Sequence, residues 1–571
     1  MHIHDVLIIG AGPCGLAIAA RLHEHTPSAT FTDDEHQRYH WIRKHGQKMT
    51  IRNRRKNKDQ LPRSSTASTS SSRKIDMVVL DADGDTWMAK WNRLFSLFGI
   101  QHLRSPMFFH VDPSDRDALL AYAYRQGREK ELQCLPGCAG KEVSKHRKKK
   151  RMHARGPISQ SGPDVDERDR KDYFTPSTSV FRAHCTEIAR CYGLGEELVR
   201  KEKVVNVTYG EIDAFRDTEH DSVIEEDIED AYTKVFKVES DKGTHYARTV
   251  VLAIGPGNTP KVPAIRGLPS STPETPHHGF SHALHLHQFP TSRLEARIKT
   301  GASTNLLIVG GGLTSVQLAD LALKKGINRV WLLMRGDVKV KYFDIGLDWV
   351  GKFRNVKQAE FWSADTDEER LEMYLEARNG GSITPRYRKI LNSHVTSGKL
   401  SLRTYTTLES VAWDATTYTW ATTMKTMPKD DKSPLPTHEA TSAPTPSPPL
   451  FDYIIFATGV QLDIRTIPFL SNLQESHPVT CAGGLPCLTE DMMWSDEVPL
   501  FVTGRFAGLR LGPGAPNLVG ARIGAERVAW GIEDLLEKVN PSGKGSEGEK
   551  IKDWTTGRWN RYDSLGDVVS S

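Results

Sequence analysis

Residues 6–15 read Val-Leu-Ile-Ile-Gly-Ala-Gly-Pro-Cys-Gly, and this stretch decides the fold class. The four apolar residues are typical of a buried parallel strand, and the glycines that follow have the spacing Gly-x-Gly-x-x-Gly. The first glycine allows a tight turn, the second lets the backbone approach a pyrophosphate, and the third lets the next helix pack closely on the strand. The amino end of that helix favours phosphate. We therefore expect a dinucleotide to be bound by Gly10, Gly12, Pro13, Cys14 and Gly15.

An acidic residue about 20 positions after the glycines holds a ribose hydroxyl in modules of this kind. Asp33, Asp34 and Glu35 lie near this distance, after the short run Ala29–Thr32. Asp33 and Asp34 fit the spacing best. The sequence leaves open which of the three acids makes the contact.

A second glycine turn follows another apolar run, because residues 306–315 read Leu-Leu-Ile-Val-Gly-Gly-Gly-Leu-Thr-Ser. Serine is small enough to replace the third glycine. The next apolar run, 329–334, ends in Arg335, where a site for NADH would carry a carboxylate. Arg335, alone or with Lys339 or Lys341, can pair with a 2′-phosphate and favours NADPH; the alternative is a plain surface arginine. The second predicted site comprises Gly310, Gly312, Leu313, Thr314, Ser315 and Arg335.

Short apolar runs alternate with helical patterns along the chain, which predicts a doubly wound α/β architecture. The predicted strands are 6–9, 250–254, 306–309, 330–334, 453–457 and 500–502, and the predicted helices are 17–25, 316–325 and 518–535. The fold class expected is α/β with two Rossmann-like dinucleotide-binding domains, the second inserted in the first. We expect the first domain at 1–290, the inserted domain at 300–445, the return of the first domain at 450–540, and a disordered tail at 541–571.

Several polar stretches have a composition that cannot supply a hydrophobic core, and we expect them to be disordered insertions. They are residues 53–74, 141–172, 217–230 and 427–449. The basic run 146–151 lies in one of them and could be a solvated loop, a nuclear localisation signal or a phosphate-binding patch.

Composition restricts the class of protein. The 571 residues carry a net charge of +5, with 38% hydrophobic and 26% charged residues, which fits a soluble enzyme and gives no sign of a nucleic-acid binder. No secretory leader and no apolar stretch of membrane-spanning length is visible, so a cytoplasmic protein without membrane contact is expected. The seven cysteines form no Cys-x-x-Cys pair, which disfavours a disulfide reductase.

Three further segments carry a resemblance to a known family. Residues 452–459 read Asp-Tyr-Ile-Ile-Phe-Ala-Thr-Gly, residues 501–505 read Phe-Val-Thr-Gly-Arg, and residues 512–518 read Gly-Pro-Gly-Ala-Pro-Asn-Leu. With the run 251–255 these resemble the class B flavin-dependent monooxygenases, nearest the ornithine and lysine N-hydroxylating enzymes. The layout is also similar to the oxidative-stress-induced growth inhibitor flavoproteins. The chain departs from the family at Val460, where a tyrosine is usual, and at Arg465-Thr466.

This resemblance implies FAD at the first glycine turn and NADPH at the second. It implies further cofactor-binding residues, namely Gly255, Thr458, Gly459, Gly504, Arg505, Asn517 and Leu518. The reaction implied is oxygenation of an amine or similar nucleophile, through a C4a-hydroperoxyflavin formed with molecular oxygen. Two alternatives stay open: a flavin reductase or oxidase without oxygen transfer, and a non-catalytic regulatory flavoprotein.

Neither a catalytic residue nor a metal site is predicted from the sequence. The cluster at His277, His278, His282, His285 and His287 has irregular spacing and lacks nearby carboxylates, which disfavours metal binding. An oligomer is possible.

Overall fold

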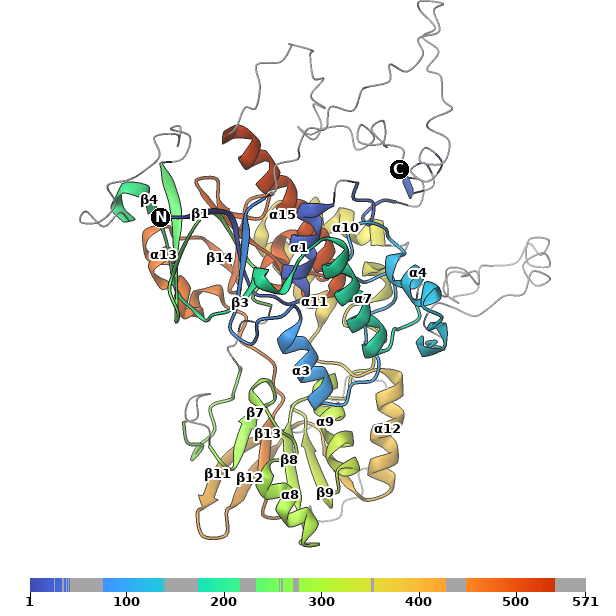
Figure 1. Ribbon diagram of the computed structural model, residues 1–571. Coiled ribbons are helices and arrows are strands. Elements are labelled where there is room, and N and C mark those ends of the chain that lie inside the picture. Colours follow the sequence, from blue (N-terminus) through green and yellow to red (C-terminus); the bar gives the residue numbers. More distant parts are fainter. Residues whose placement is uncertain are drawn as a thin grey trace, which may run out of the picture.

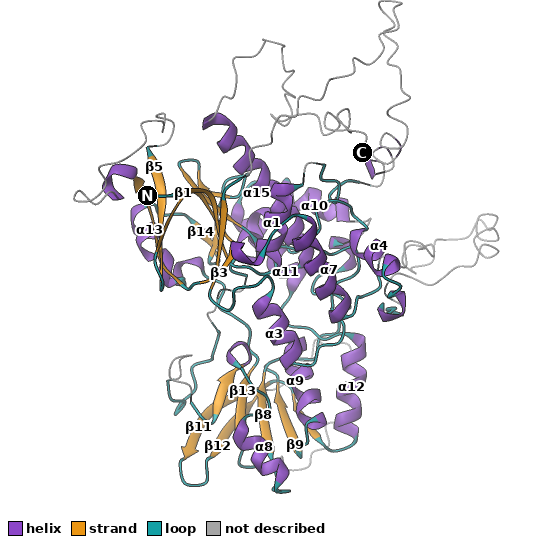
Figure 2. Ribbon diagram, viewed as in Figure 1, coloured by secondary structure: helices purple, strands orange, loops and turns teal. Residues whose placement is uncertain are grey.

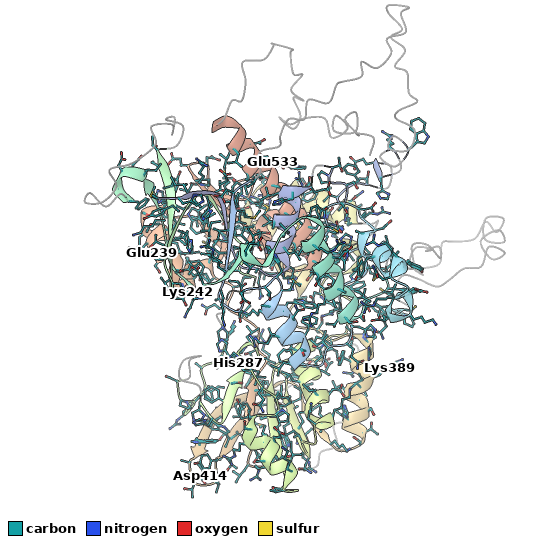
Figure 3. The ribbon with its side chains drawn as sticks, viewed as in Figure 1. Glu239, Lys242, His287, Lys389, Asp414 and Glu533 are labelled. Atoms are coloured by element: carbon teal, nitrogen blue, oxygen red, sulfur yellow. The ribbon has the colours of Figure 1, made fainter. Side chains whose placement is uncertain are left out.

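The computed structural model has two lobes, each built on its own sheet, which is mixed in the first lobe and parallel in the second (Figure 1). Figure 3 shows Glu533 on the first lobe and Asp414 near the far end of the second. The structure describes residues 1–24, 26–32, 35–36, 38, 41, 75–136, 138, 173–215, 233–255, 257, 260–270, 277–350, 354–427 and 448–539. The predicted insertions 53–74, 141–172 and 217–230, most of 427–449, the basic run 146–151 and the tail 541–571 lie outside these residues.

The first lobe contains an eight-stranded sheet with the order β16-β17-β6-β1-β2-β3, and β5 joins β4 to β6. Strands β1, β2, β3, β6 and β17 run parallel. Residues Val6–Ile9 are buried because helices cover this sheet (Figure 2). The strands are β1 (Ile3–Ile9), β2 (Met77–Asp81), β3 (Val199–Lys201), β4 (Val204–Glu211), β5 (Lys234–Ser240), β6 (Thr244–Leu252), β16 (Met493–Ser495) and β17 (Val498–Val502).

Helices α1 (Pro13–His23) and α15 (Leu518–Val539) pack together in this lobe. Arg21 on α1 donates hydrogen bonds from Nε to Glu526 (2.8 Å) and from Nη1 to Glu533 (3.1 Å) on α15. The Arg21 side chain is only 5% exposed. Since a buried guanidinium without its carboxylate costs about 3–5 kcal/mol, this pair fixes the register of the two helices. Also in the first lobe are α4 (Ala118–Arg125), α7 (Thr178–Cys191), α13 (Ser471–Ser476), α14 (Gly508–Leu511), β14 (Cys481–Ala482) and β15 (Leu485–Pro486).

The second lobe contains a five-stranded parallel sheet with the order β10-β9-β8-β13-β7. A hairpin of β11 (Thr406–Asp414) and β12 (Thr419–Thr426) adds Trp420 to its core. The sheet strands are β7 (Phe280–His282), β8 (Asn305–Val309), β9 (Arg329–Leu333), β10 (Leu400–Arg403) and β13 (Tyr453–Phe456), and the helices are α8 (Ser292–Lys299), α9 (Leu313–Lys324) and α12 (Pro385–Thr396).

The prediction of an α/β fold with two Rossmann-like units, the second inserted in the first, is confirmed. All six predicted strands and all three predicted helices are present. The sheets divide the chain at points that differ from the predicted boundaries. Strands β7 (before residue 290) and β13 (after residue 450) lie in segments expected to belong to the first domain. Both nevertheless pair within the second sheet, where β13 lies between β7 and β8.

Two helical excursions join the lobes. Helix α3 (Ala89–Leu97) begins beside the first glycine turn, where the Met88 N–H donates to the Ala11 carbonyl oxygen (2.8 Å). Its residues Leu94 and Leu97, with Phe98, pack into the hydrophobic core of the second lobe. In Figure 1 this helix lies between the two lobes.

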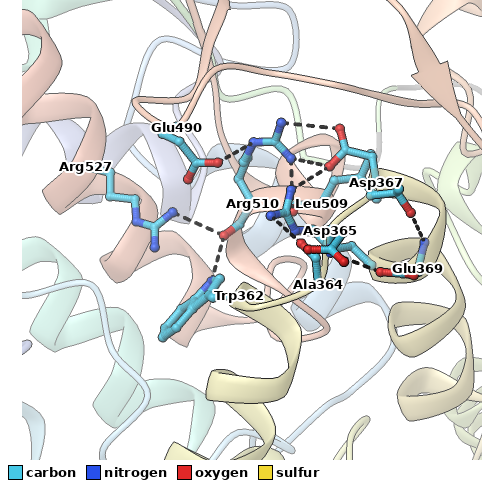
Figure 4. Close-up of polar contacts among 11 residues, drawn as sticks. Trp362, Ala364, Asp365, Asp367, Glu369, Glu490, Leu509, Arg510 and Arg527 are labelled. Atoms are coloured by element: carbon cyan, nitrogen blue, oxygen red, sulfur yellow. Dashed lines mark hydrogen bonds and ion pairs between the residues drawn. The ribbon is translucent and has the colours of Figure 1, made fainter.

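Helices α10 (Arg354–Trp362) and α11 (Asp367–Arg378) belong to the chain of the second lobe but pack against the first lobe. Asp367 at the start of α11 forms an ion pair with Arg510 of α14, and Trp362 donates a hydrogen bond to the Arg510 carbonyl oxygen (Figure 4). Burial alone would raise the pKa of Asp367, but hydrogen bonds from Arg510 and Arg370 hold it below its ordinary value. These contacts anchor α11 to the first lobe.

Candidate functional site

The first glycine turn leaves the carboxyl end of β1 and is held by its neighbours. The Gly10 N–H donates to the Leu80 carbonyl oxygen (2.8 Å). Gly10 has φ +111, and a Cβ there would lie 2.6 Å from the Ala253 carbonyl oxygen. A Cβ on Gly15 would lie 2.0 Å from the Gly10 carbonyl oxygen. Only glycine fits these two positions, whereas a Cβ on Gly12 meets no atom within 4 Å, which leaves space over the turn for a phosphate.

Asp81 occupies the place where a ribose-binding acid is needed. It is the last residue of β2, the strand beside β1, and its Oδ2 accepts a hydrogen bond from the Ala11 N–H in the glycine turn (2.7 Å). Its Oδ1 accepts from the N–H groups of Asp83 (2.8 Å) and Gly84 (3.2 Å). The sequence prediction named Asp33 and Asp34 for this role, and both lie outside the residues that the structure describes.

The second glycine turn repeats the geometry of the first. The Gly310 N–H donates to the Leu333 carbonyl oxygen (2.9 Å), and a Cβ on Gly310 would lie 2.3 Å from the Ala457 carbonyl oxygen. A Cβ on Gly312 meets no atom within 4 Å, as at Gly12. Leu313 and Thr314 open α9, and the buried Ser315 hydroxyl donates to the Gly312 carbonyl oxygen (2.7 Å). The turn therefore accepts serine at its third position.

Arg335 follows β9 and is exposed. The two lysines considered with it are engaged elsewhere. Lys339 Nζ donates to the backbone and side-chain oxygens of Asn379 (2.9 and 2.7 Å), and Lys341 Nζ donates to the Ala377 and Arg378 carbonyl oxygens (3.3 and 3.1 Å). Both lysines are therefore held by the end of α11 and the residue after it, whereas Arg335 is exposed at the end of β9.

Residues after β17 approach the first glycine turn. A Cβ on Gly504, which has φ +67, would lie 3.1 Å from the Cys14 Sγ. Burial raises the pKa of Cys14 to about 12, so this cysteine is a neutral packing group and not a thiolate nucleophile. Burial also lowers the pKa of Arg505, whose buried Nε has no hydrogen-bond acceptor within the described part of the chain. Asn517 and Leu518 stand at the amino end of α15, where free N–H groups favour negative charge.

Gly255, Thr458 and Gly459 lie where the chain passes between the lobes. The Lys261 N–H donates to the Gly459 carbonyl oxygen (3.0 Å), and the Thr458 hydroxyl donates to the Lys261 carbonyl oxygen. Gly255 and Gly459 both have positive φ, +61 and +80. The two crossover segments thus run side by side, and Thr458 and Gly459 pair with the other crossover.

The end of α11 and the segment after it contact both the second glycine turn and the first lobe. A Cβ on Gly381 would lie 3.1 Å from the Cα of Gly312, so this backbone packs directly on the second turn. At the end of α11, Arg378 donates to the Pro513 carbonyl oxygen (3.0 Å), in the loop that precedes α15. Arg104 from the first lobe donates to the Ser382 hydroxyl (2.9 Å). Sequence reasoning missed Gly381 and Arg104, because only their long-range contacts distinguish them.

A cavity of about 400 Å³ lies between the segment before α10 and the helices α10 and α11. Its lining includes three carboxylates and two lysines. Lys357 pairs with Glu360 (2.8 Å), and Lys341 is held by the end of α11. The full lining is Lys341, Tyr342, Phe343, Ile345, Gly346, Leu347, Asp348, Trp349, Lys357, Glu360, Met373, Glu376 and Ala377.

Comparison with solved structures identifies the architecture. The chain aligns with the reduced ornithine hydroxylase PvdA from Pseudomonas aeruginosa, with TM-score 0.53, 14% identity, and coverage of 94% of this chain and 100% of that chain. It also aligns with the Kutzneria sp. 744 ornithine N-hydroxylase KtzI with reduced FAD, NADP⁺ and L-ornithine, with TM-score 0.56, 12% identity, and coverage of 93% of this chain and 99% of that chain. The fold is that of the flavin-dependent N-hydroxylating monooxygenases.

A third structure of this fold is the FAD-bound cadaverine monooxygenase DfoA from Erwinia amylovora, with TM-score 0.52, 13% identity, and coverage of 95% of each chain. The sequence itself gives a shorter match. The family model of ketopantoate reductase PanE/ApbA matches residues 6–81, which run from β1 to the last residue of β2 and so include Asp81. No curated protein matches the chain.

One further observation concerns helix length and polarity. None of the helices in the described part of the chain is long and apolar enough to cross a membrane.

Proposed function

We propose that the chain is an FAD-dependent, NADPH-using monooxygenase that acts in the cytoplasm on an amine or similar small nucleophile, with molecular oxygen as its second substrate. The observation that carries this proposal is the pair of glycine turns of matching geometry, one per lobe, in two lobes that α3 and the segment from α11 to Gly381 hold together. The solved structures of this fold supply the class, since their names specify ornithine and cadaverine hydroxylation with FAD and NADP⁺.

The first lobe has residues that fit FAD. The space over Gly12 admits a pyrophosphate, and Asp81 presents a carboxylate at the end of β2 for a ribose hydroxyl. Arg505 and the amino end of α15 offer positive charge to the isoalloxazine ring. When bound, FAD accepts hydride and activates oxygen, and the chain's part is to hold the cofactor and exclude water.

The second lobe has residues that fit NADPH. Gly312 leaves the corresponding space, and Arg335 offers a guanidinium that can pair with a 2′-phosphate. The domain of 1–290 with 450–540 would thus be the flavin unit and 300–445 the nicotinamide unit, with β7 and β13 counted in the latter.

An amine fits the cavity next to α11. Its lining carries Asp348, Glu360 and Glu376 against Lys341 and Lys357, an excess of negative charge that favours a cationic ligand. Tyr342 and Trp349 add aromatic surface suited to an ammonium group.

The test is a screen of amines and amino acids with purified FAD-loaded protein, measuring NADPH oxidation together with product mass. We expect one compound to accelerate NADPH oxidation and to gain one oxygen atom. NADPH oxidation that yields only hydrogen peroxide with every compound would make the protein an oxidase. A yellow protein that leaves NADPH unchanged would make it a regulatory flavoprotein.

Glu376→Gln sharpens this test. Removing one cavity carboxylate is expected to raise the KM for the amine about 10–150-fold, because a hydrogen-bonded charge contributes about 1.5–3 kcal/mol. Glu372→Gln, one turn earlier on α11 and exposed outside the cavity lining, is the matched control and should leave KM unchanged.

A further inference from the structure

Two histidines and an aspartate converge at the amino-terminal edge of the first sheet. His2 Nε2 and His4 Nδ1 both lie against the same oxygen, Asp76 Oδ2, at 2.8 and 3.0 Å. The three ligand atoms lie within 4.8 Å of one another. This edge is opposite to the carboxyl ends of β1 and β2, where the first glycine turn and Asp81 lie. The cluster is therefore separate from the proposed cofactor site.

The backbone explains why these side chains meet. His2 and His4 are two residues apart in extended chain at the start of β1, so they lie on the same face. Asp76 immediately precedes β2, the parallel neighbour of β1, and the amino ends of parallel strands share one edge. The Asp76 carbonyl oxygen accepts from the N–H groups of Asp5 (3.0 Å) and Val6 (3.1 Å), which fixes the position of the carboxylate.

Buried groups beneath the cluster support Asp76. The Asp76 N–H donates to Asp5 Oδ2 (3.0 Å), and Asp5 Oδ1 accepts from Arg248 Nη1 (2.6 Å). Asp5 is 2% exposed, so this support is rigid. Above it, His2 is 71% exposed and Asp76 44%, which leaves an open approach from solvent.

We propose that His2, His4 and Asp76 bind one divalent transition-metal ion of the zinc, nickel or cobalt type. Ligand atoms about 2.0–2.1 Å from a tetrahedral ion lie about 3.3–3.4 Å apart, so the His–Asp separations of 2.8 and 3.0 Å need to lengthen only by about half an ångström to admit the ion. Two imidazoles with one carboxylate suit these borderline ions and not Mg²⁺ or Ca²⁺, which take oxygen ligands. The ion takes the place of the ring protons that face Asp76: a neutral imidazole then carries its proton on the other ring nitrogen, a protonated one releases a proton to solvent, and water completes the coordination.

Such an ion would fasten the start of β1 to the start of β2, two paired strands separated in the chain by residues 10–76. Binding only to the folded state raises the melting temperature with metal concentration. The sequence analysis predicted no metal site, since Asp76 is 72 positions from His4 and no ligand-spacing motif covers that distance.

The experiment uses untagged full-length protein loaded with FAD and treated with chelator, then titrated with Zn²⁺ and Ni²⁺ in a calorimeter and in thermal melts. We expect one strong equivalent of Zn²⁺ per chain and a melting temperature several degrees higher, with no shift for Mg²⁺. His2→Asn, His4→Asn and Asp76→Asn should each weaken Zn²⁺ binding at least tenfold while the flavin content stays unchanged.

The matched control is His394→Asn, which removes the one histidine of another His–Asp pair, His394 Nε2 to Asp320 Oδ1 (2.9 Å), and should leave the Zn²⁺ equivalent intact. The exposed residue His2 makes the test robust, because its replacement leaves the buried Asp5–Arg248 pair in place. No strong equivalent in the wild type, or the same equivalent in His2→Asn and Asp76→Asn, would overturn the proposal. Flavin and NADPH assays are independent of either result.

Discussion

The first and second glycine turns share one backbone geometry and differ in the side chains that surround it. The first glycine N–H of each turn donates a hydrogen bond to the equivalent carbonyl oxygen of the neighbouring strand, Leu80 in one lobe and Leu333 in the other. Ile9 pairs with Leu80 as Val309 pairs with Leu333, so Asp81 and Met334 occupy equivalent positions. The backbone geometry of the two turns is thus alike, and the side chains at the strand ends differ: a carboxylate in the first lobe, a guanidinium one residue later in the second. On the proposed function, this difference distinguishes FAD from NADPH.

The largest effects are expected from breaking either turn. A Cβ at position 10 or 310 forces an unfavourable backbone and a close contact, about 1–3 kcal/mol each, which amounts to at least a ~30-fold loss of affinity. Gly10→Ala should yield colourless protein, and Gly310→Ala yellow protein that NADPH cannot reduce. Flavin absorbance and anaerobic reduction measure both effects. Gly127→Ala, at a positive φ with no contact within 4 Å, is the control, and exchanged phenotypes would reverse the assignment of the lobes.

Reversing the charge at the second strand end should alter cofactor preference. Arg335→Asp removes a charge-assisted contact worth about 1.5–3 kcal/mol and adds repulsion, so the KM for NADPH should rise about 10–100-fold while that for NADH changes little. Steady-state kinetics with both cofactors measure this. Arg329→Asp, exposed at the other end of β9, should change neither KM. An equal rise for both cofactors would remove the 2′-phosphate role from Arg335.

The first strand end should show a smaller effect. Asp81→Asn keeps the shape of the side chain and removes its charge, so FAD affinity should fall about tenfold, as expected for one weakened hydrogen bond of about 1–1.5 kcal/mol. Flavin fluorescence on dilution gives the dissociation constant. Asp34→Asn is the natural comparison, because the sequence spacing favoured that residue. A loss of FAD in Asp34→Asn with none in Asp81→Asn would assign the ribose contact to Asp34 and not to Asp81.

The smallest effect is expected at the third position of the second turn. Ser315→Gly removes the hydroxyl bond to Gly312 and adds flexibility, about 0.5–1.5 kcal/mol, so the KM for NADPH should change less than about tenfold. The reverse exchange, Gly15→Ser, places a Cβ 2.0 Å from the Gly10 carbonyl oxygen and should abolish FAD binding. If Gly15→Ser binds FAD as tightly as the wild type, the first turn accepts serine at its third position just as the second turn does, and the close packing at Gly15 does not require glycine.

Local patterns were enough to predict the two turns and their strands, because Gly10, Gly15 and Gly310 are required by contacts within a few residues or with an adjacent strand. The ribose acid was not predictable by counting. Residues 24–76 separate α1 from β2, so the spacing rule points to Asp33 and Asp34. The available signal was the apolar run Met77–Leu80, which ends in Asp81.

Contacts between distant segments could not be predicted from the sequence, because they depend on how the lobes and helices pack together. Gly381 packs on Gly312, and Arg104 reaches Ser382, only because α11 is anchored to the first lobe by Arg510. The same holds for β7 and β13, whose sheet is chosen by spatial neighbours. No periodicity or spacing encodes these pairings.

The most direct test is anaerobic titration of the wild-type protein after reconstitution with FAD. The account predicts one FAD per chain and bleaching of its visible absorbance by one equivalent of NADPH, much faster than by NADH. A chain that retains no flavin, or a bound flavin that both nicotinamides reduce equally fast, would contradict it.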